Sequence, residues 1–439
     1  MENKAPERVS ASRGLLALSP MAVFLLSYVA VSLYIGDFYK MPVAVALALA
    51  SVWAVLLCRR IPLLERIEIF SRAAGHSNIL YMIWVFVLAG AFANLARATG
   101  AVDATVQLTL SAFPLRFVVP TLFVAACFIS MAVGTSVGTV VALTPLAAEI
   151  ARTSGASAPF FVASVLGGAF FGDNLSFISD TTIASTRSQG CGMADKFRAN
   201  LWICLPAALA TVALYVLFSP GAATLPAAAG ASAPAWLVLP YLIVIVAACM
   251  GVNVLLTLSL GILAALAAGA ASGHGLVEMA GELGAGIDSM GSLIVVTLLA
   301  AGLLGLIKWL GGIAFLLDRL TRYVSGVRGA QAVIAVLVGL VNLCTANNTV
   351  AIITVGSITR RISERYGVSP QKAASLLDSS ACIVQCLIPY GAQALLAASL
   401  AGISPVASIP HLYYPMLLAL AVAGSIIFSL PRSARLGLR

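Results

Sequence analysis

The chain has 439 residues, of which 61% are hydrophobic and only 9% are charged, and its formal net charge is +9. Its mean hydropathy is +1.04. Apolar runs recur from end to end and leave no room for a solvated surface, which excludes an ordinary soluble protein and predicts an all-α polytopic membrane protein. The positive charge fits contact with an anionic inner leaflet, so we infer no nucleic-acid partner.

The first apolar run, 15–36, is long enough to cross a hydrocarbon core of about 30 Å at 1.5 Å per residue. It lacks the small-residue cleavage pattern of a signal peptide, so we interpret it as a retained first span after a tail at 1–14. With the two broken helices described below, the apolar periodicity predicts about ten transmembrane helices. The other uninterrupted spans are predicted at 41–58, 79–96, 196–218, 236–250, 253–271, 290–310 and 411–430.

Two apolar segments, 118–151 and 330–359, are interrupted in the middle by polar clusters. The clusters read G134-T-S-V-G-T139 and N342-L-C-T-A-N-N-T349. Each half of either segment is too short to cross comfortably, so we predict two re-entrant hairpins whose tips lie near mid-membrane.

Two further segments, 159–187 and 373–400, also contain polar residues at their centres. We predict that both are crossing helices that unwind there. Non-helical backbone at that depth must line a protein-enclosed or water-filled cavity, because lipid cannot satisfy its N–H and C=O groups.

The two halves of the chain follow the same order of elements. A shift of 211 residues, from 163 to 374, places A163-S-V-L166 on A374-S-L-L377, and it places Pro159 on Pro370. We therefore predict an inverted repeat, the architecture of secondary transporters that bind at mid-membrane where the repeats meet. The predicted boundaries are a first repeat at 15–218, an external linker at 219–235, a second repeat at 236–430 and a cytoplasmic tail at 431–439.

The basic residues support this topology. With the amino terminus inside, 21 of the 25 basic residues fall in predicted cytoplasmic segments, and Lys196 is among them. Lys40, Arg97, Arg116 and Arg152 fall outside. We therefore expect both termini in the cytoplasm of a multi-pass cell-membrane protein, and a bacterial inner membrane fits this short chain best.

Three of the sixteen acidic residues, Asp173, Asp180 and Asp378, lie inside predicted spans, whereas twelve fall in tails or loops. An uncompensated charge at a helix centre costs roughly 2.5 to 3.5 kcal/mol, so each needs a partner, a cation or a proton. We expect no lysine or arginine at that depth, because the nearest, Lys308, can reach the interface. These aspartates are therefore candidates for binding a small cation or a proton.

Asp173 and Asp180 would stand about 10 Å apart along a continuous helix, too far to hold one ion. Unwinding 174–179 would let both approach one site and would release backbone carbonyls. Sodium prefers such oxygen ligands, and burial favours the protonated carboxyl whereas a bound cation favours the ionised one, so sodium and proton compete. The predicted sodium or proton ligands are Asp173, Asp180, Asn174, Ser176, Ser179, Thr181 and Asp378, with sodium held through Asp173 and Asp180 and no other cofactor.

Structural alternatives remain for several of these residues. Asp173 or Asp180 is otherwise a helix cap within the broken helix. Asp378 is either an ion or proton site or a structural hydrogen-bond partner of the tip residues Asn347 and Asn348. The glycines Gly167, Gly168 and Gly172 allow either close helix packing or backbone approach to an ion.

The hairpin tips and the second broken helix supply further candidates for substrate binding. The tip residues otherwise only satisfy a turn, and the residues of the second broken helix otherwise lock helices together. The candidates are Gly134, Thr135, Ser136, Gly138, Thr139, Asn347, Asn348, Thr349, Gln385, Tyr390 and Gln393.

Two stretches resemble the NhaC-type sodium/proton antiporter family, in which G-T-x-x-G-T precedes F-G-D-x-x-S-P-x-S-D-T-T. They are G134-T-S-V-G-T139 and F170-F-G-D-N-L-S-F-I-S-D-T-T182. The resemblance implies the wider ion transporter superfamily, whose members are typically homodimers with a scaffold and a moving transport domain built from two hairpins and two broken helices. The positions that match the family motifs are Gly134, Thr135, Gly138, Thr139, Asp173, Ser176, Ser179, Asp180 and Thr181.

The chain departs from the family pattern at two places. Phe177 stands where the family usually has proline, and L387-I-P-Y-G-A-Q393 stands where many members have a P-W motif. The coupling ion can therefore be kept while the transported species differs. Sodium/proton exchange is the favoured function, and sodium- or proton-coupled transport of a small organic anion or amino acid is the alternative. An intramembrane aspartyl protease would not need an inverted repeat, so we expect no enzyme.

Overall fold

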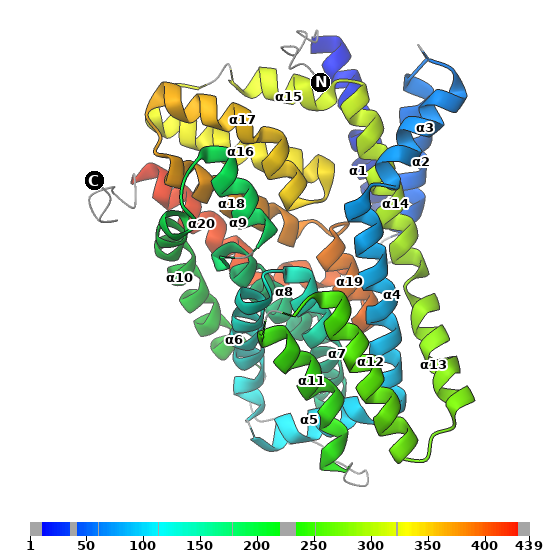
Figure 1. The fold of residues 1–439 in the computed structure, drawn as a ribbon. Coiled ribbons are helices and arrows are strands. Elements are labelled where there is room, and N and C mark those ends of the chain that lie inside the picture. Colours follow the sequence, from blue (N-terminus) through cyan, green and yellow to red (C-terminus); the bar gives the residue numbers. More distant parts are fainter. Residues whose placement is uncertain are drawn as a thin grey trace.

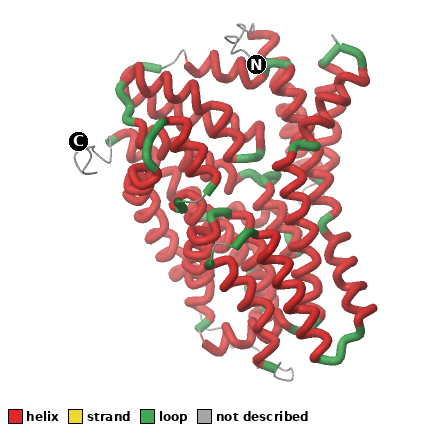
Figure 2. The backbone as a smooth tube through the Cα atoms, in the orientation of Figure 1, coloured by secondary structure: helices red, strands yellow, loops and turns green. Residues whose placement is uncertain are grey.

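The structure is a computed structural model that describes residues 11–35, 42–59, 61–112, 114–177, 179–219, 234–250, 252–321 and 324–428. The predicted carboxy-terminal tail and most of the predicted amino-terminal tail and linker lie outside these ranges. Within them every regular element is helical, which confirms the all-α class (Figure 2). Eight of the described helices are long and apolar enough to cross a membrane, or nine if the bent pair near the carboxyl end is one span.

Two helical hairpins enter from opposite ends of the molecule, and their tips approach each other near its centre (Figure 1). The first consists of α6 (Leu115–Val133) and α7 (Ser136–Ser154), and the second of α16 (Gly326–Thr345) and α17 (Asn348–Tyr366). Their arms have 19 or 20 residues. The arms are longer than predicted, because the helices continue past the predicted outer ends of both hairpins. The expectation that each arm is too short to cross was therefore wrong. The arms nevertheless turn back at the tips.

Two interrupted helices pack against these hairpins. The first is α8 (Ala158–Leu175) followed by α9 (Asp180–Gln189), and the second is α18 (Pro370–Leu387) followed by α19 (Ala392–Ala401). Both have a first half of 18 residues and a second half of 10 residues. The first break is shorter than predicted, because Asn174 and Leu175 still belong to α8.

Equivalent hydrogen bonds tie each hairpin to its own broken helix. The Ser130 hydroxyl of α6 donates to the carbonyl of Ala169 in α8 at 2.6 Å. The Asn342 side-chain amide of α16 donates to the carbonyl of Ala381 in α18 at 2.8 Å. The two halves therefore share helix lengths, helix order and an anchoring contact, as two copies of one unit would.

Helices α4, α12, α13 and α14 form a wall along one side of this core, with α4 and α14 running in opposite directions, and α10 and α20 pack on the other side (Figure 1). Segment 276–289, expected to be a loop, is helical and continues into the next span, because it packs along α4. Gly90 and Gly286 allow that close approach: a Cβ on Gly90 would lie 2.2 Å from the Gly286 carbonyl oxygen. The other helices are α1 (Ala11–Ile35), α2 (Val43–Leu57), α3 (Leu63–Ala74), α4 (Ser77–Ala98), α5 (Ala101–Ala112), α10 (Met193–Phe218), η1 (Ala235–Val238), α11 (Leu239–Cys249), α12 (Val254–Ala271), α13 (Leu276–Ser289), α14 (Gly291–Trp309), α15 (Gly312–Thr321), η2 (Pro405–His411) and α20 (Tyr413–Ile427).

Glycines on α8 set the distance between the first hairpin and the first broken helix. A Cβ on Gly168 would lie 2.4 Å from the carbonyl oxygen of Phe123 and 2.6 Å from the Cβ of Ala126. A Cβ on Gly172 would lie 2.4 Å from the Cβ of Ser130. Both glycines therefore serve close helix packing, the first of the two alternatives offered by the sequence.

We expect Gly168→Ala to lower the melting temperature of the purified protein. The added methyl group forces α6 and α8 apart, and overpacking of this kind costs about 1 to 3 kcal/mol, more than the helix propensity gained from alanine. Gly284→Ala is the matched control, because a Cβ there meets no atom within 4 Å. A Gly168→Ala protein that melts with or above the control would contradict the packing role.

Candidate functional site

A cavity of about 400 Å³ lies where the two hairpin tips and the two broken helices meet α4 and the start of α12. It collects candidates from both halves of the chain into one polar chamber. Those that line it are Gly134, Thr135, Ser136, Asp173, Asp180, Thr181, Asn347, Asn348, Thr349, Gln385 and Gln393, together with Asn78, Tyr81 and Asn253 outside the predicted set.

Asp173 is buried at the edge of this cavity, near the carboxyl end of α8, with 5% of its surface exposed. Its Oδ1 accepts a hydrogen bond from the Ser179 hydroxyl at 2.5 Å. Its Oδ2 accepts from the Ser136 hydroxyl at 3.0 Å and from the Asn348 side-chain amide at 3.4 Å. The carboxylate thus contacts the break and both hairpin tips, and it is not a helix cap.

Asp180 is the first residue of α9, and it is exposed in the cavity. The cap of this helix is Ser179, whose hydroxyl accepts from the Thr181 backbone N–H at 3.3 Å. The capping alternative was therefore wrong for Asp180 as well. The break at 176–179 places both carboxylates on one cavity, with Asp180 at the positive end of a half-helix.

A chain of side-chain amides links Asp173 to the second broken helix. Gln393 Nε2 donates to the Ser136 hydroxyl, and Gln385 Nε2 donates to Gln393 Oε1, both at 3.0 Å. Gln385 Nε2 also donates to the carbonyl of Ala346 at 2.9 Å. Ala346 is the only described non-glycine residue with positive φ, +48°, so this bond supports a strained tip backbone.

The other candidates face away from the cavity. Asn174 points toward α10 and α18, and the Ser176 hydroxyl donates to the Met131 carbonyl at 2.9 Å. The Tyr390 hydroxyl donates to the carbonyl of Leu343 at 2.7 Å, so this residue ties its break to α16. Gly138 packs on α12, and Thr139 is fully buried.

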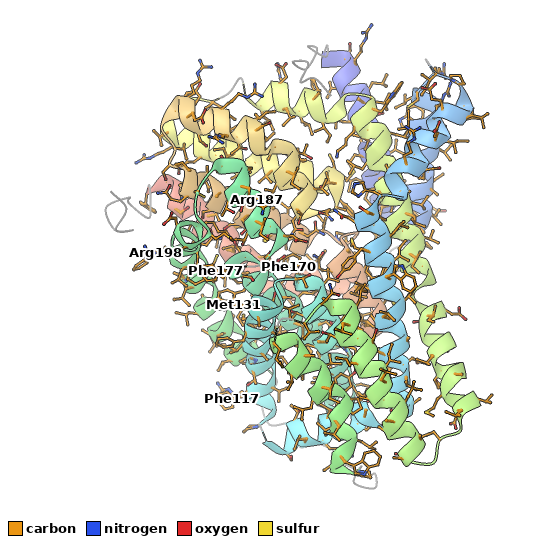
Figure 3. All side chains as sticks on the ribbon, viewed as in Figure 1. Phe117, Met131, Phe170, Phe177, Arg187 and Arg198 are labelled. Atoms are coloured by element: carbon orange, nitrogen blue, oxygen red, sulfur yellow. The ribbon has the colours of Figure 1, made fainter. Side chains whose placement is uncertain are left out.

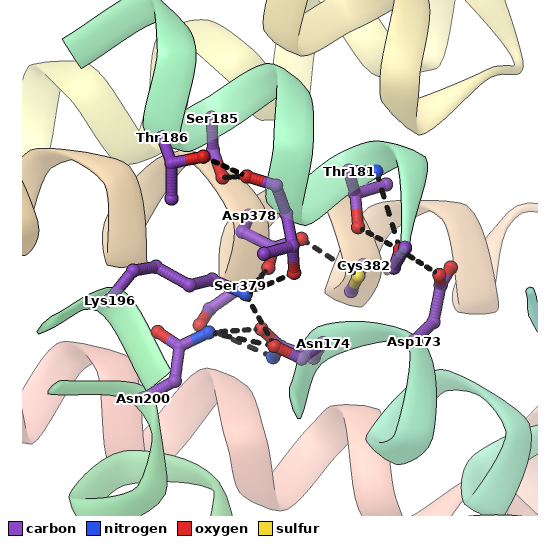
Figure 4. Close-up of polar contacts among 12 residues, drawn as sticks. Asp173, Asn174, Thr181, Ser185, Thr186, Lys196, Asn200, Asp378, Ser379 and Cys382 are labelled. Carbon is purple, nitrogen blue, oxygen red and sulfur yellow. Dashed lines mark hydrogen bonds and ion pairs between the residues drawn. The ribbon is translucent and has the colours of Figure 1, made fainter. Parts of the chain in front are cut away.

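Asp378 forms an ion pair with Lys196 of α10, and both side chains are buried, with at most 1% exposed (Figure 4). One expectation and one of the two alternatives for Asp378 were therefore wrong. A lysine does lie at this depth, and Asp378 does not bond the Asn347–Asn348 tip, since Asn348 donates to Asp173 instead. Lys196 had been assigned to a cytoplasmic segment because it lies close to the predicted start of a span, yet its four-carbon stem lets the ammonium group reach inward.

The Lys196 ammonium group also donates to the Asn174 carbonyl at 2.5 Å and to the Thr182 hydroxyl at 2.7 Å. Asn200, one turn further along α10, donates through Nδ2 to the Asn174 carbonyl at 3.1 Å and to its Oδ1 at 2.5 Å. Lys196 and Asn200 are the residues that the sequence interpretation missed. Their spacing of four on one helix face, next to a polar break, was the available signal.

Phe177, the residue that departs from the family motif, lies outside the cavity and is 47% exposed (labelled in Figure 3). Its ring stacks on that of Phe197 with centroids 4.6 Å apart. Phe177 therefore forms an aromatic contact between the break and α10 and does not line the cavity.

The described residues contain no cluster of three or more histidine, cysteine or acidic side chains. The oxygen-bearing groups that line the cavity are the carboxylates of Asp173 and Asp180 together with hydroxyl and amide side chains. Alkali cations accept such a set of hard oxygen ligands.

Two hairpins and two broken helices around a central polar cavity define the class of the protein, a secondary transporter. The model of the family described as "Na+/H+ antiporter family" matches residues 14–219 and 222–430. The chain therefore belongs to the Na+/H+ antiporter family, which is a family of transporters and not of enzymes.

Two curated relatives come from Bacillus subtilis (strain 168). A malate-2H(+)/Na(+)-lactate antiporter is 29% identical over 195 residues, 43% of this chain and 41% of that protein. The Na(+)/H(+) antiporter NhaC is 24% identical over 380 residues, 77% of this chain and 82% of that protein. Among solved structures, the YdaH transporter of Alcanivorax borkumensis aligns with 83% of this chain and 89% of that one, at 15% identity and a TM-score of 0.42.

We expect Asn200→Leu to lower the melting temperature, because it removes a buried donor to Asn174 and leaves polar atoms at the break unpaired. Loss of such a partner costs about 1 to 3 kcal/mol. Asn78→Leu, at an exposed position on the cavity wall, is the control. Equal melting temperatures of the two variants would show that Asn200 does not support the break.

Proposed function

We propose that this chain exchanges sodium ions for protons across the membrane through the carboxyl group of Asp173. The observation that supports this most directly is the placement of one buried carboxylate at the edge of a polar cavity, in contact with both hairpin tips and the break. Asp180 faces the same cavity and supplies the second carboxylate.

Competition at Asp173 provides the exchange. Burial favours a site without net charge, and either a proton or a sodium ion neutralises the carboxylate. The two cannot bind the same pair of carboxylate oxygens at the same time. The hydroxyls of Ser136 and Ser179 donate to the carboxylate. Each also has lone pairs, so rotation of the hydroxyl presents oxygen to a sodium ion beside Asp173.

The repeat architecture provides a way for the site to open first to one side of the membrane and then to the other. The hairpins and broken helices form one body that contacts the ion, and the α4, α12 and α14 wall forms the other. Alternating access then requires one body to rock against the other around a neutralised site. We further propose that both termini lie in the cytoplasm and that the chain forms a homodimer in a bacterial inner membrane.

In proteoliposomes without organic solute, we expect a sodium gradient to drive proton movement, and we expect Asp173→Asn and Asp180→Asn to reduce that movement at least tenfold. An amide at either position cannot exchange a proton for a cation. Internal pH, followed with a trapped dye, is the measurement.

Asp288→Asn is the control for these variants, because this acid is exposed on α13 and outside the cavity. Full activity in Asp173→Asn would contradict the proposed role of that carboxyl group. Loss of activity in Asp288→Asn as well would show that the assay reports charge in general.

Coupled transport of a small organic anion is the second candidate, and the size of the cavity supports it. A volume of about 400 Å³ greatly exceeds that of a bare ion. Four helices also begin at residues lining this cavity, namely α7 at Ser136, α9 at Asp180, α17 at Asn348 and α19 at Ala392. Helix N-termini favour negative charge, so a carboxylate solute could bind there without a buried arginine.

The two candidates separate in one experiment. For simple exchange we expect sodium-driven proton movement to be unchanged when lactate, malate or an amino acid is added. If proton movement appears only after one of these acids is supplied, organic-anion transport replaces simple exchange. Gln393→Ala then tests the cavity, since it should raise the KM for that acid more than the KM for sodium.

A further inference from the structure

The ion pair between Lys196 and Asp378 connects α10 to the second broken helix. Lys196 lies on α10, at the end of the first repeat, and Asp378 lies in the first half of the second broken helix. The ammonium group also contacts both sides of the first break, through Asn174 before it and Thr182 after it. One positive charge is therefore shared by α8, α9 and α18.

The groups around the ammonium ion form a cation-binding set. They are a carboxylate oxygen of Asp378, the backbone carbonyl of Asn174 at 2.5 Å and the hydroxyl of Thr182 at 2.7 Å. Hard monovalent cations take the same kinds of oxygen, and an ammonium group with three N–H donors is matched by three acceptors. These side chains are buried, so water does not compete for the charge.

These ligands lie apart from the cavity that holds the proposed sodium site. Asn174, Thr182, Lys196 and Asp378 are absent from its lining, whereas Asp173 and Asp180 belong to it. The two sites are nevertheless neighbours, because Asn174 follows Asp173 directly in the chain.

We propose that Lys196 is a tethered cation filling a second monovalent-cation site formed by Asp378, Asn174 and Thr182. The lysine holds this site permanently occupied, so it takes no ion from solution in the natural chain. Shortening Lys196 should open the site to sodium or to a primary alkylammonium ion. This inference does not require Asp173 to carry sodium, so it stands or falls separately from the proposed function.

Lys196→Ala is the direct test, and n-propylammonium is the matched probe, because it has the three carbons and the ammonium group that the substitution removes. The purified variant is heated in choline chloride, whose cation is too large for the site, with increasing sodium or n-propylammonium. We expect a melting temperature below that of the natural chain and a saturable rise of about 5 °C with either probe. The natural chain should not respond to n-propylammonium.

Two controls separate a cation site from a general effect. 1-Propanol fills the same space without charge and should give no saturable rise. In Lys196→Ala/Asp378→Asn the carboxylate is gone, so the response to n-propylammonium should be lost while the protein remains folded without it. If Lys196→Ala alone does not fold, its yield of monodisperse protein should be recovered when membranes are extracted in n-propylammonium.

Several results would overturn the proposal. One is a Lys196→Ala protein as stable as the natural chain and insensitive to both probes. Another is an unstable variant that no cation restores, by melting temperature or by yield. A response that persists in the double variant would equally show that Asp378 does not form the site.

Discussion

Unwound backbone in the middle of a membrane must find its hydrogen-bond partners inside the protein, and this constraint organises the whole structure. At the first break the Asn174 carbonyl receives Lys196 and Asn200, and the Ser176 hydroxyl reaches across to α6. At the second break Tyr390 reaches α16. The hairpins, α10 and α18 are therefore arranged as the polar environment that lipid cannot provide.

The same arrangement divides the buried acids by role. Asp378 is neutralised inside the protein by a lysine of α10. Among the described residues, the hydrogen-bond donors to Asp173 are neutral, two hydroxyls and an amide, and Asp173 borders the cavity with Asp180. A carboxylate without a fixed counter-charge can accept a mobile cation or a proton, which is why we propose Asp173 rather than Asp378 for the exchange.

Periodicity and polar interruptions in the sequence were sufficient to predict both hairpins and both broken helices. In a membrane protein, a polar cluster inside an apolar run is usually accommodated at a hairpin tip or at a helix break. Helix ends were harder to predict. The hairpin arms extend beyond the apolar segments, because polar residues such as those near Arg365 are still helical. Segment 276–289 was missed because its acids suggested a loop, whereas its helix depends on packing against α4.

The sequence grouped correctly those candidate residues that are close in the chain, since Asp173, Ser179 and Asp180 do lie together at the first break. The site was not predicted where it depends on long-range pairing. Nothing in the local sequence places Lys196 beside Asp378 or Gln393 beside Ser136, because each pair joins two repeats through tertiary packing. The length of a lysine side chain adds to the difficulty, since the position of its backbone does not fix the depth of its charge.

If sodium and a proton compete for Asp173, sodium binding to the purified protein must release protons, and the number released per sodium ion can be measured. Calorimetric titrations in buffers of different ionisation enthalpy give that number across a range of pH. We expect release to reach about one proton per sodium ion and to disappear in Asp173→Asn. Sodium binding without proton release at any pH, or release that persists in Asp173→Asn, would contradict competition at Asp173.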